Sequence, residues 1–99
     1  MKVRFVQSGG FVGAVRACEL DTAALAPDAA REVERLVGES GIAGSGVLLS
    51  DRAPDLQQYQ IAIEDGGARS VVYDDSSIPA SAKPLLGFLK KHAGPRTLA

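Results

Sequence analysis

An alternating stretch followed by a glycine turn constrains the fold of this chain more than any other feature. Residues 57–64 alternate between the two faces of a strand, and one face is apolar throughout: Tyr59, Ile61 and Ile63. Asp65-Gly66-Gly67 follows, and residues 69–74 alternate again. The pattern predicts an antiparallel hairpin with one buried face, which the rest of the chain has to cover.

A second hairpin is predicted at the start of the chain. Residues 2–7 and 13–20 are typical of strands, and Ser8-Gly9-Gly10-Phe11 lies between them. The glycines suit a tight turn because such turns need positive φ. Phe11 is unusual, since a large ring at a loop tip either caps its own sheet or stays in water as an anchor for another molecule. The residues alone leave both alternatives open.

Two amphipathic helices can cover the predicted sheet. The first is expected from Pro27, which suits the first helical position, to about Glu39. The second is expected over residues 81–91, after a looser turn from Pro79. Their apolar stripes are Ala29, Val33, Leu36 and Val37 in the first helix and Ala82, Leu85, Leu86 and Leu89 in the second.

These elements follow the order ββαββα and define the fold class. We expect an α+β protein, with an antiparallel sheet of about four strands and two helices on one face. The two Gly-Gly turns are expected at the same end of that sheet. Residues 42–56 are least regular, and their apolar Val47-Leu48-Leu49 fits a short strand or a turn of helix. With 99 residues, we expect a single domain over residues 1–93 and a flexible tail over 94–99.

Charge and composition exclude several kinds of partner. The formal net charge is −1, so no field attracts nucleic acid or an anionic membrane. No apolar run approaches the roughly 20 residues of a membrane span. The start of the chain runs directly into a strand, without a secretory segment. Cys18 is the single cysteine, which fits a buried inert thiol and a reducing compartment. We therefore expect a cytoplasmic protein.

The sequence offers little for catalysis. His92 is the only histidine, and it lies at the end of the last predicted helix, where a cation suits the helix dipole. Glu64-Asp65 and Asp74-Asp75 lie at turns, where aspartate commonly bonds the local backbone. No zinc-ligand spacing or phosphate loop is present. We expect no enzyme, no metal and no cofactor, although an enzymatic alternative would combine the acidic turns with His92.

Four pieces of the chain, in this order, resemble the emfourin family. They are Ser8-Gly9-Gly10-Phe11, the run from Glu19 to Leu25, the run from Tyr59 to Gly67, and Ile78-Pro79 through Pro84-Leu85-Leu86-Gly87-Phe88-Leu89. The resemblance extends from the first strand to the last helix. Emfourins are small bacterial proteins that inhibit protealysin-like enzymes, which are zinc metalloproteases of the thermolysin type.

The resemblance implies a function that needs no chemistry from this chain. A protein inhibitor needs rigid loops that enter a cleft at low ordering cost. We expect Phe11 to fill an apolar pocket of the protease, with Ser8, Gly9 and Gly10 shaping the approach. Asp65, Gly66 and Gly67 are expected as a second contact loop. The inhibitor would be reversible, non-covalent and monomeric when free. The alternative is a non-catalytic interaction module without a protease target, which uses its hairpin tips or an unpaired strand edge.

Overall fold

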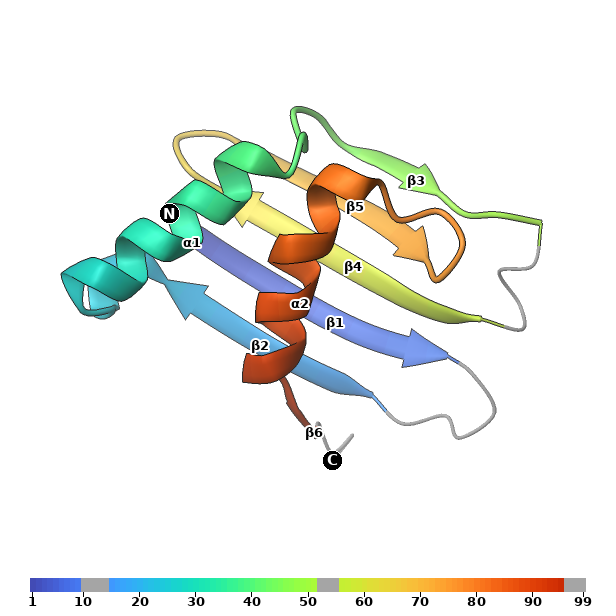
Figure 1. Ribbon diagram of the computed structural model, residues 1–99, viewed down its shortest axis with the longest axis horizontal. Helices are drawn as coiled ribbons and strands as arrows, with labels where there is room; N and C mark the ends of the chain where they lie inside the picture. Colours follow the sequence, from blue (N-terminus) through green and yellow to red (C-terminus); the bar gives the residue numbers. More distant parts are fainter. Residues whose placement is uncertain (10–14, 52–55, 96–99) are drawn as a thin grey trace.

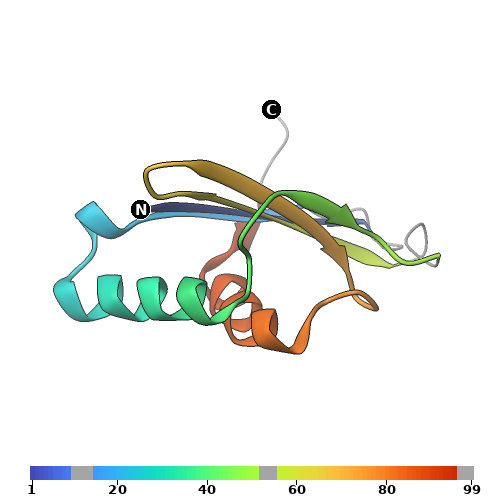
Figure 2. The same ribbon diagram turned by 90° about the horizontal axis from the view of Figure 1, so that it is seen from above.

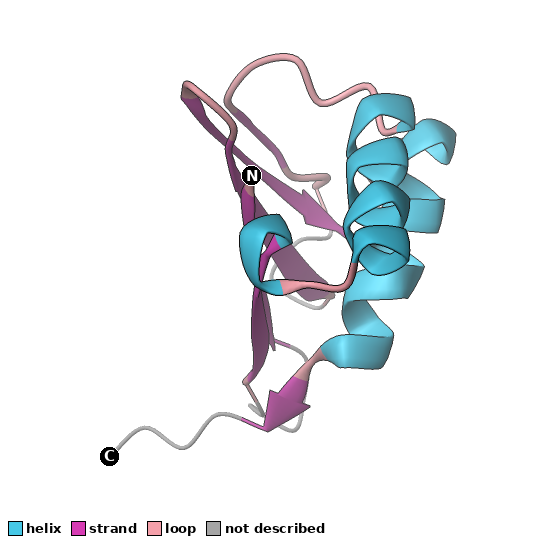
Figure 3. Cartoon of the chain, turned by 90° about the vertical axis from the view of Figure 1, so that its left-hand side faces the viewer, coloured by secondary structure: helices cyan, strands magenta, loops and turns pink. Residues whose placement is uncertain are grey.

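One sheet and two helices make up the structure, a computed structural model that describes residues 1–9, 15–51 and 56–95 (Figure 1). Both helices lie on the same face of the sheet, and none of the described residues forms a helix over the opposite face (Figure 2). The side view in Figure 3 shows the same two layers. The α+β class, with helices on one face of a mostly antiparallel sheet, is confirmed.

The sheet contains four long strands and two short edge strands. The long strands are β1 (Lys2–Gly9), β2 (Arg16–Asp21), β4 (Gln57–Glu64) and β5 (Ala68–Asp74). The edge strands are β3 (Gly46–Leu48) and β6 (Gly94–Pro95). The spatial order is β3-β5-β4-β1-β2-β6. Every neighbouring pair is antiparallel except β3 and β5, which are parallel.

Both helices have a proline in their first turn. A short 3₁₀ turn, η1 (Thr22–Ala24), precedes α1 (Pro27–Glu39), and η3 (Ala80–Ala82) precedes α2 (Lys83–His92). Pro27 and Pro84 occupy the first turns of α1 and α2, where a missing N–H leaves no helical bond unmade. The predicted start and end of α1 and the looser turn before α2 are both confirmed.

The core lies between the helices and the sheet face that they cover. Alternate residues of the central strands point into it, and the two helices contribute their apolar stripes. The buried apolar side chains are Val3, Phe5, Val33, Leu36, Val37, Ile42, Tyr59, Ile61, Ile63, Val71, Tyr73, Ala82, Leu85, Leu86, Leu89 and Ala93. The hydrophobic spacing of the sequence therefore identified the faces correctly.

The two hairpins lie at opposite ends of the sheet. Strands β1 and β4 are antiparallel neighbours in a register that pairs Lys2 with Glu64 and Gly9 with Gln57. The end of β4 therefore lies beside the start of β1, and the turn after β4 is remote from the connection after β1 (Figure 1). The prediction that the two Gly-Gly turns share one end is wrong, because β1 and β4 run in opposite directions.

The structure bears on two other expectations. Val47 and Leu48 belong to a strand, so the strand alternative for the irregular middle segment is the right one. Gly94 and Pro95 were expected within a flexible tail over 94–99, but Gly94 pairs with Ala17 and Pro95 with Arg16. The Arg16 guanidinium also donates to the Ala93 carbonyl at 2.9 Å. Residues 96–99 lie outside the described residues.

Candidate functional site

The candidate site is the end of the sheet where β1 ends at Gly9 and β4 begins at Gln57; we call it the loop end. Ser8 and Gly9 pair with Gln58 and Gln57 at this end. Residues 10–14 follow Gly9 in the sequence and residues 52–55 precede Leu56; both segments lie outside the described residues. Of the predicted contact residues, Ser8 and Gly9 lie here, whereas Gly10 and Phe11 lie outside the described residues.

Gly9 allows a close approach of two segments at the loop end. Its φ is 93°, a left-handed conformation that side chains disfavour. A Cβ at this position would lie 3.0 Å from the carbonyl oxygen of Leu56. Because both the backbone conformation and the space require glycine, the departure of the chain from β1 is fixed relative to the start of β4.

Substitution of Gly9 by alanine is expected to lower the free energy of unfolding by roughly 1–2 kcal/mol, because the new Cβ meets backbone in an unfavourable conformation. Urea denaturation followed by circular dichroism measures this loss. Gly44→Ala is the matched control, since a Cβ there meets nothing within 4 Å. If both variants lose the same free energy of unfolding, the close approach at Gly9 does not contribute to stability.

Asp74 ties the segment after β3 to the end of β5. Its side chain is fully buried, and its Oδ2 accepts hydrogen bonds from the Ser50 N–H at 2.6 Å and the Ser50 hydroxyl at 2.7 Å. Its Oδ1 accepts from the Ser76 N–H at 2.8 Å. Burial acts to raise the pKa of Asp74, but the hydrogen bonds from Ser50 and Ser76 outweigh it and hold the pKa below its ordinary value.

Asp75 and Tyr59 brace the loop end from the helix side of the sheet. The Tyr59 hydroxyl donates to Asp75, which also accepts from the Gln57 N–H at 3.2 Å. Burial, and then the hydrogen bond to Asp75, raise the pKa of Tyr59. The Lys90 ammonium lies 4.6 Å from the centre of the Tyr59 ring. Side chains from β4, α2 and the turn after β5 thus hold the first residues of β4.

The depressed pKa of Asp74 predicts acid lability. A carboxyl whose folded pKa lies below its unfolded value of about 3.9 contributes stability above that value and loses it as the pH falls through the folded pKa. We expect the free energy of unfolding to fall as the pH drops below about 4. Urea denaturation at a series of pH values measures this dependence. In the Asp74→Asn variant, the free energy of unfolding should fall less steeply as the pH drops below about 4.

Asp65 provides the comparison for this pH series. A hydrogen bond from Arg69 lowers the pKa of Asp65, so it contributes in the same direction but from the other end of the sheet. Asp65→Asn should therefore remove a separate part of the acid dependence. If Asp74→Asn leaves the pH dependence of the free energy of unfolding below about pH 4 unchanged, the pKa of Asp74 is not depressed.

The turn after β4 is well formed but belongs to the opposite end. Gly66 has a φ of 95°, and the Asp65 N–H donates to the Gly67 carbonyl at 3.1 Å. Asp65 also pairs with Arg69 at 2.7 Å. Strand β4 has eight residues, so this turn lies roughly 25 Å from the loop end at about 3.3 Å per residue. The structure does not bring the two predicted contact loops together.

The residues considered for catalysis do not converge. Among the described residues, no group of three or more His, Cys, Asp or Glu side chains is arranged to hold a metal ion. Cys18 donates to the Leu89 carbonyl at 3.6 Å, and burial raises the pKa of its thiol, which disfavours a nucleophilic thiolate. His92 stacks on Phe88, with ring centres 4.3 Å apart. Asp65 precedes β5 and Asp74 is its last residue, so the two carboxylates lie at opposite ends of that strand.

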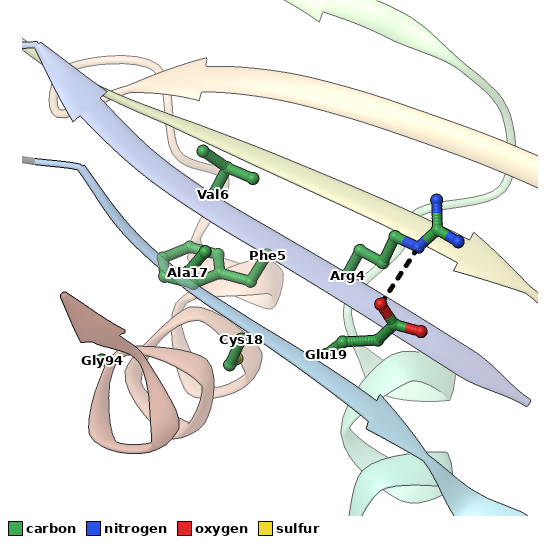
Figure 4. A pocket seen from close by; sticks show the side chains of 7 residues that line it. All are labelled: Arg4, Phe5, Val6, Ala17, Cys18, Glu19 and Gly94. Carbon is green, nitrogen blue, oxygen red and sulfur yellow. Dashed lines mark ion pairs between the residues drawn. The ribbon is translucent and has the colours of Figure 1, made fainter. Parts of the chain in front are cut away.

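A hollow of about 640 Å³ lies along β1 and β2 and beside Gly94 (Figure 4). Its charged side chains, Arg4 and Glu19, pair with each other at 3.5 Å across the two strands, and both are more than half exposed. Val6 and Ala17 also line it. An exposed pair of this kind contributes little binding energy and shows no catalytic arrangement.

Together these observations define a two-layer α+β protein in which side-chain hydrogen bonds hold the end of β5 and the start of β4 at the loop end. In the described part of the chain, neither helix has the length and apolar character needed to cross a membrane. The family model of Emfourin matches residues 5–90, and the chain belongs to the Emfourin family. This membership is consistent with a protease-inhibitor role. No curated protein and no solved structure matches the chain.

Sequence reasoning missed two contributors to the loop end. Ser50 was treated as part of an irregular segment, although its backbone and hydroxyl both bond Asp74, 24 residues away in the sequence. The pairing of β3 with β5 was also missed. The apolar run Val47-Leu48-Leu49 was a visible signal for a strand, but nothing local indicated which strand it would join.

Proposed function

We propose that this protein is a reversible, non-covalent inhibitor of a protealysin-like or thermolysin-like zinc metalloprotease. The connection after β1 enters the active-site cleft, and the inhibitor itself takes no part in chemistry. Membership of the Emfourin family supports the class of target. The observation that carries the proposal is the braced loop end, where Gly9 packs against the Leu56 carbonyl.

A braced loop end suits an inhibitor for a physical reason. A loop whose flanking strand is already fixed loses less entropy when it binds in a cleft. Ser8 and Gly9 belong to β1 and pair with the start of β4, beyond the last pair of β1 with β2 at Gln7, so the connection leaves from a strand that is fixed on its β4 side. We assign the contact to Ser8, Gly9, Gly10 and Phe11, with Phe11 as the anchor in an apolar pocket of the enzyme.

The turn at Asp65-Gly66-Gly67 is left out of this contact. A cleft that receives the loop end cannot at the same time enclose a turn at the far end of β4. The proposed setting is a bacterial cytoplasm, where the protein acts as a monomer with the protease as its partner and without a cofactor.

The proposal is tested by adding the purified protein to a thermolysin-type metalloprotease that cleaves a fluorogenic peptide. We expect saturable, competitive inhibition that is reversed on dilution, and no effect on a trypsin-like serine protease. Full protease activity at high micromolar concentrations of folded protein would overturn the proposal. That result would favour a non-catalytic interaction module without a protease target.

A further inference from the structure

An exposed apolar strip lies on the edge strand β3 and just after it. Val47 is 68% exposed, Leu48 52% and Leu49 39%, and these are the exposed large apolar side chains of the described residues. We call these three residues the β3 strip. Residues 40–50 contain no charged side chain. Three consecutive apolar side chains exposed to water are typical of a contact surface.

The β3 strip is held in an extended conformation from both sides. Before it, the Ser45 hydroxyl accepts a hydrogen bond from the Ser70 N–H at 2.9 Å. After it, Ser50 donates to the buried Asp74. Between these points β3 pairs with β5 on one side only, because it is the last strand of the sheet. A fixed edge of this kind can accept a further strand at low ordering cost.

The other edge of the sheet differs from β3. Strand β6 contains Pro95, which has no N–H to donate, and Pro95 pairs with the charged Arg16. Proline and charge are the usual means by which proteins protect an edge from unwanted pairing. Strand β3 has neither, so one edge of this sheet is protected and the other is open.

The position of the strip indicates what covers it. Strand β3 runs parallel to β5, and its last residue pairs with Tyr73, so the strip lies at the same end of the sheet as the loop end. A second copy is a poor occupant, since pairing two strands of three residues buries far less than the roughly 1,200 Å² of a stable interface. A partner that already binds at the loop end does not need to bury that much surface against β3 to form a stable complex.

We propose that the β3 strip is a second contact surface for the same metalloprotease, which adds an extended segment to the edge of the sheet as a further strand. This inference rests on the proposed function. The backbone of β3 supplies hydrogen bonds to the added segment, and Val47, Leu48 and Leu49 pack against its apolar side chains. The strip and the loop end lie at the same end of the sheet, with the end of β5 and the start of β4 between them.

The double variant Val47→Glu/Leu49→Glu tests the inference in the inhibition assay. We expect the inhibition constant to rise at least about tenfold, because two charges would be buried against the enzyme without partners. Val47→Thr/Leu49→Thr keeps strand-forming residues and should give a smaller rise. Ala68→Glu, an exposed alanine at the opposite end of β5, is the control and should leave inhibition unchanged.

The outcomes separate this inference from the proposed function. If the wild-type protein inhibits and both folded double variants inhibit equally well, the β3 strip is not a contact and the inference fails alone. If the wild-type protein does not inhibit, the proposed function fails, and the inferred occupant fails with it. A wild-type dimer in sedimentation that the glutamate variant dissolves would overturn the inference in favour of a second copy.

Discussion

Phe5→Ala is expected to lower the free energy of unfolding by about 3–5 kcal/mol, the cost of truncating a fully buried aromatic side chain. Phe5 is 0% exposed and lies in β1, between Cys18 of β2 and Ile61 of β4. Its ring stacks with that of Tyr59, at 6.3 Å between centres and an interplanar angle of 11°. The truncation therefore leaves a cavity in the centre of the sheet.

Urea denaturation followed by circular dichroism measures the effect, with Val6→Ala as the control. Val6 is the next residue of β1 and lies on the open face, opposite Ala17, where truncation should cost under about 1 kcal/mol. A domain of this size has a stability of about 5–15 kcal/mol, so Phe5→Ala removes a substantial fraction of it. Similar losses in the two variants would contradict the assignment of the two faces.

Phe11→Ala is expected to raise the inhibition constant for the metalloprotease at least about 30-fold, which corresponds to about 2 kcal/mol of binding. A central aromatic anchor in an apolar pocket characteristically contributes this much. The stability of the folded protein should change little, because the proposed role of Phe11 is contact with the enzyme and not with the core.

Phe11→Leu is the matched variant for this measurement. It keeps a large apolar side chain, so it should retain more inhibition than alanine. The thermal unfolding midpoint of each variant shows whether the fold is intact. Unchanged inhibition by a folded Phe11→Ala protein would remove Phe11 from the contact surface.

Elements with a strong local pattern could be predicted closely from the sequence. Strand β4 begins at Gln57 and ends at Glu64, as the alternation indicates, because one of its faces is buried against the helices. The start of α1 at Pro27 and its end at Glu39 were equally readable, since the apolar stripe repeats at helical spacing. These features depend on residues close together in the sequence.

Features that depend on distant pairing could not be read in the same way. The placement of the hairpins at opposite ends follows from the pairing of β1 with β4, which joins residues such as Lys2 and Glu64. The hydrogen bond from Ser50 to Asp74 likewise joins segments that are distant in the sequence. The first glycine turn was identified only in part: Gly9 has the expected positive φ, but β2 begins later than predicted, at Arg16.

Amide hydrogen exchange, measured on the protein alone and bound to a thermolysin-type metalloprotease, tests most directly whether the loop end is the inhibitory surface. We predict that binding slows exchange at Ser8, Gly9 and the connection through residues 10–14, and leaves the turn at Asp65-Gly66-Gly67 unchanged. Slower exchange at that turn, with no change at Ser8 and Gly9, would contradict the assignment.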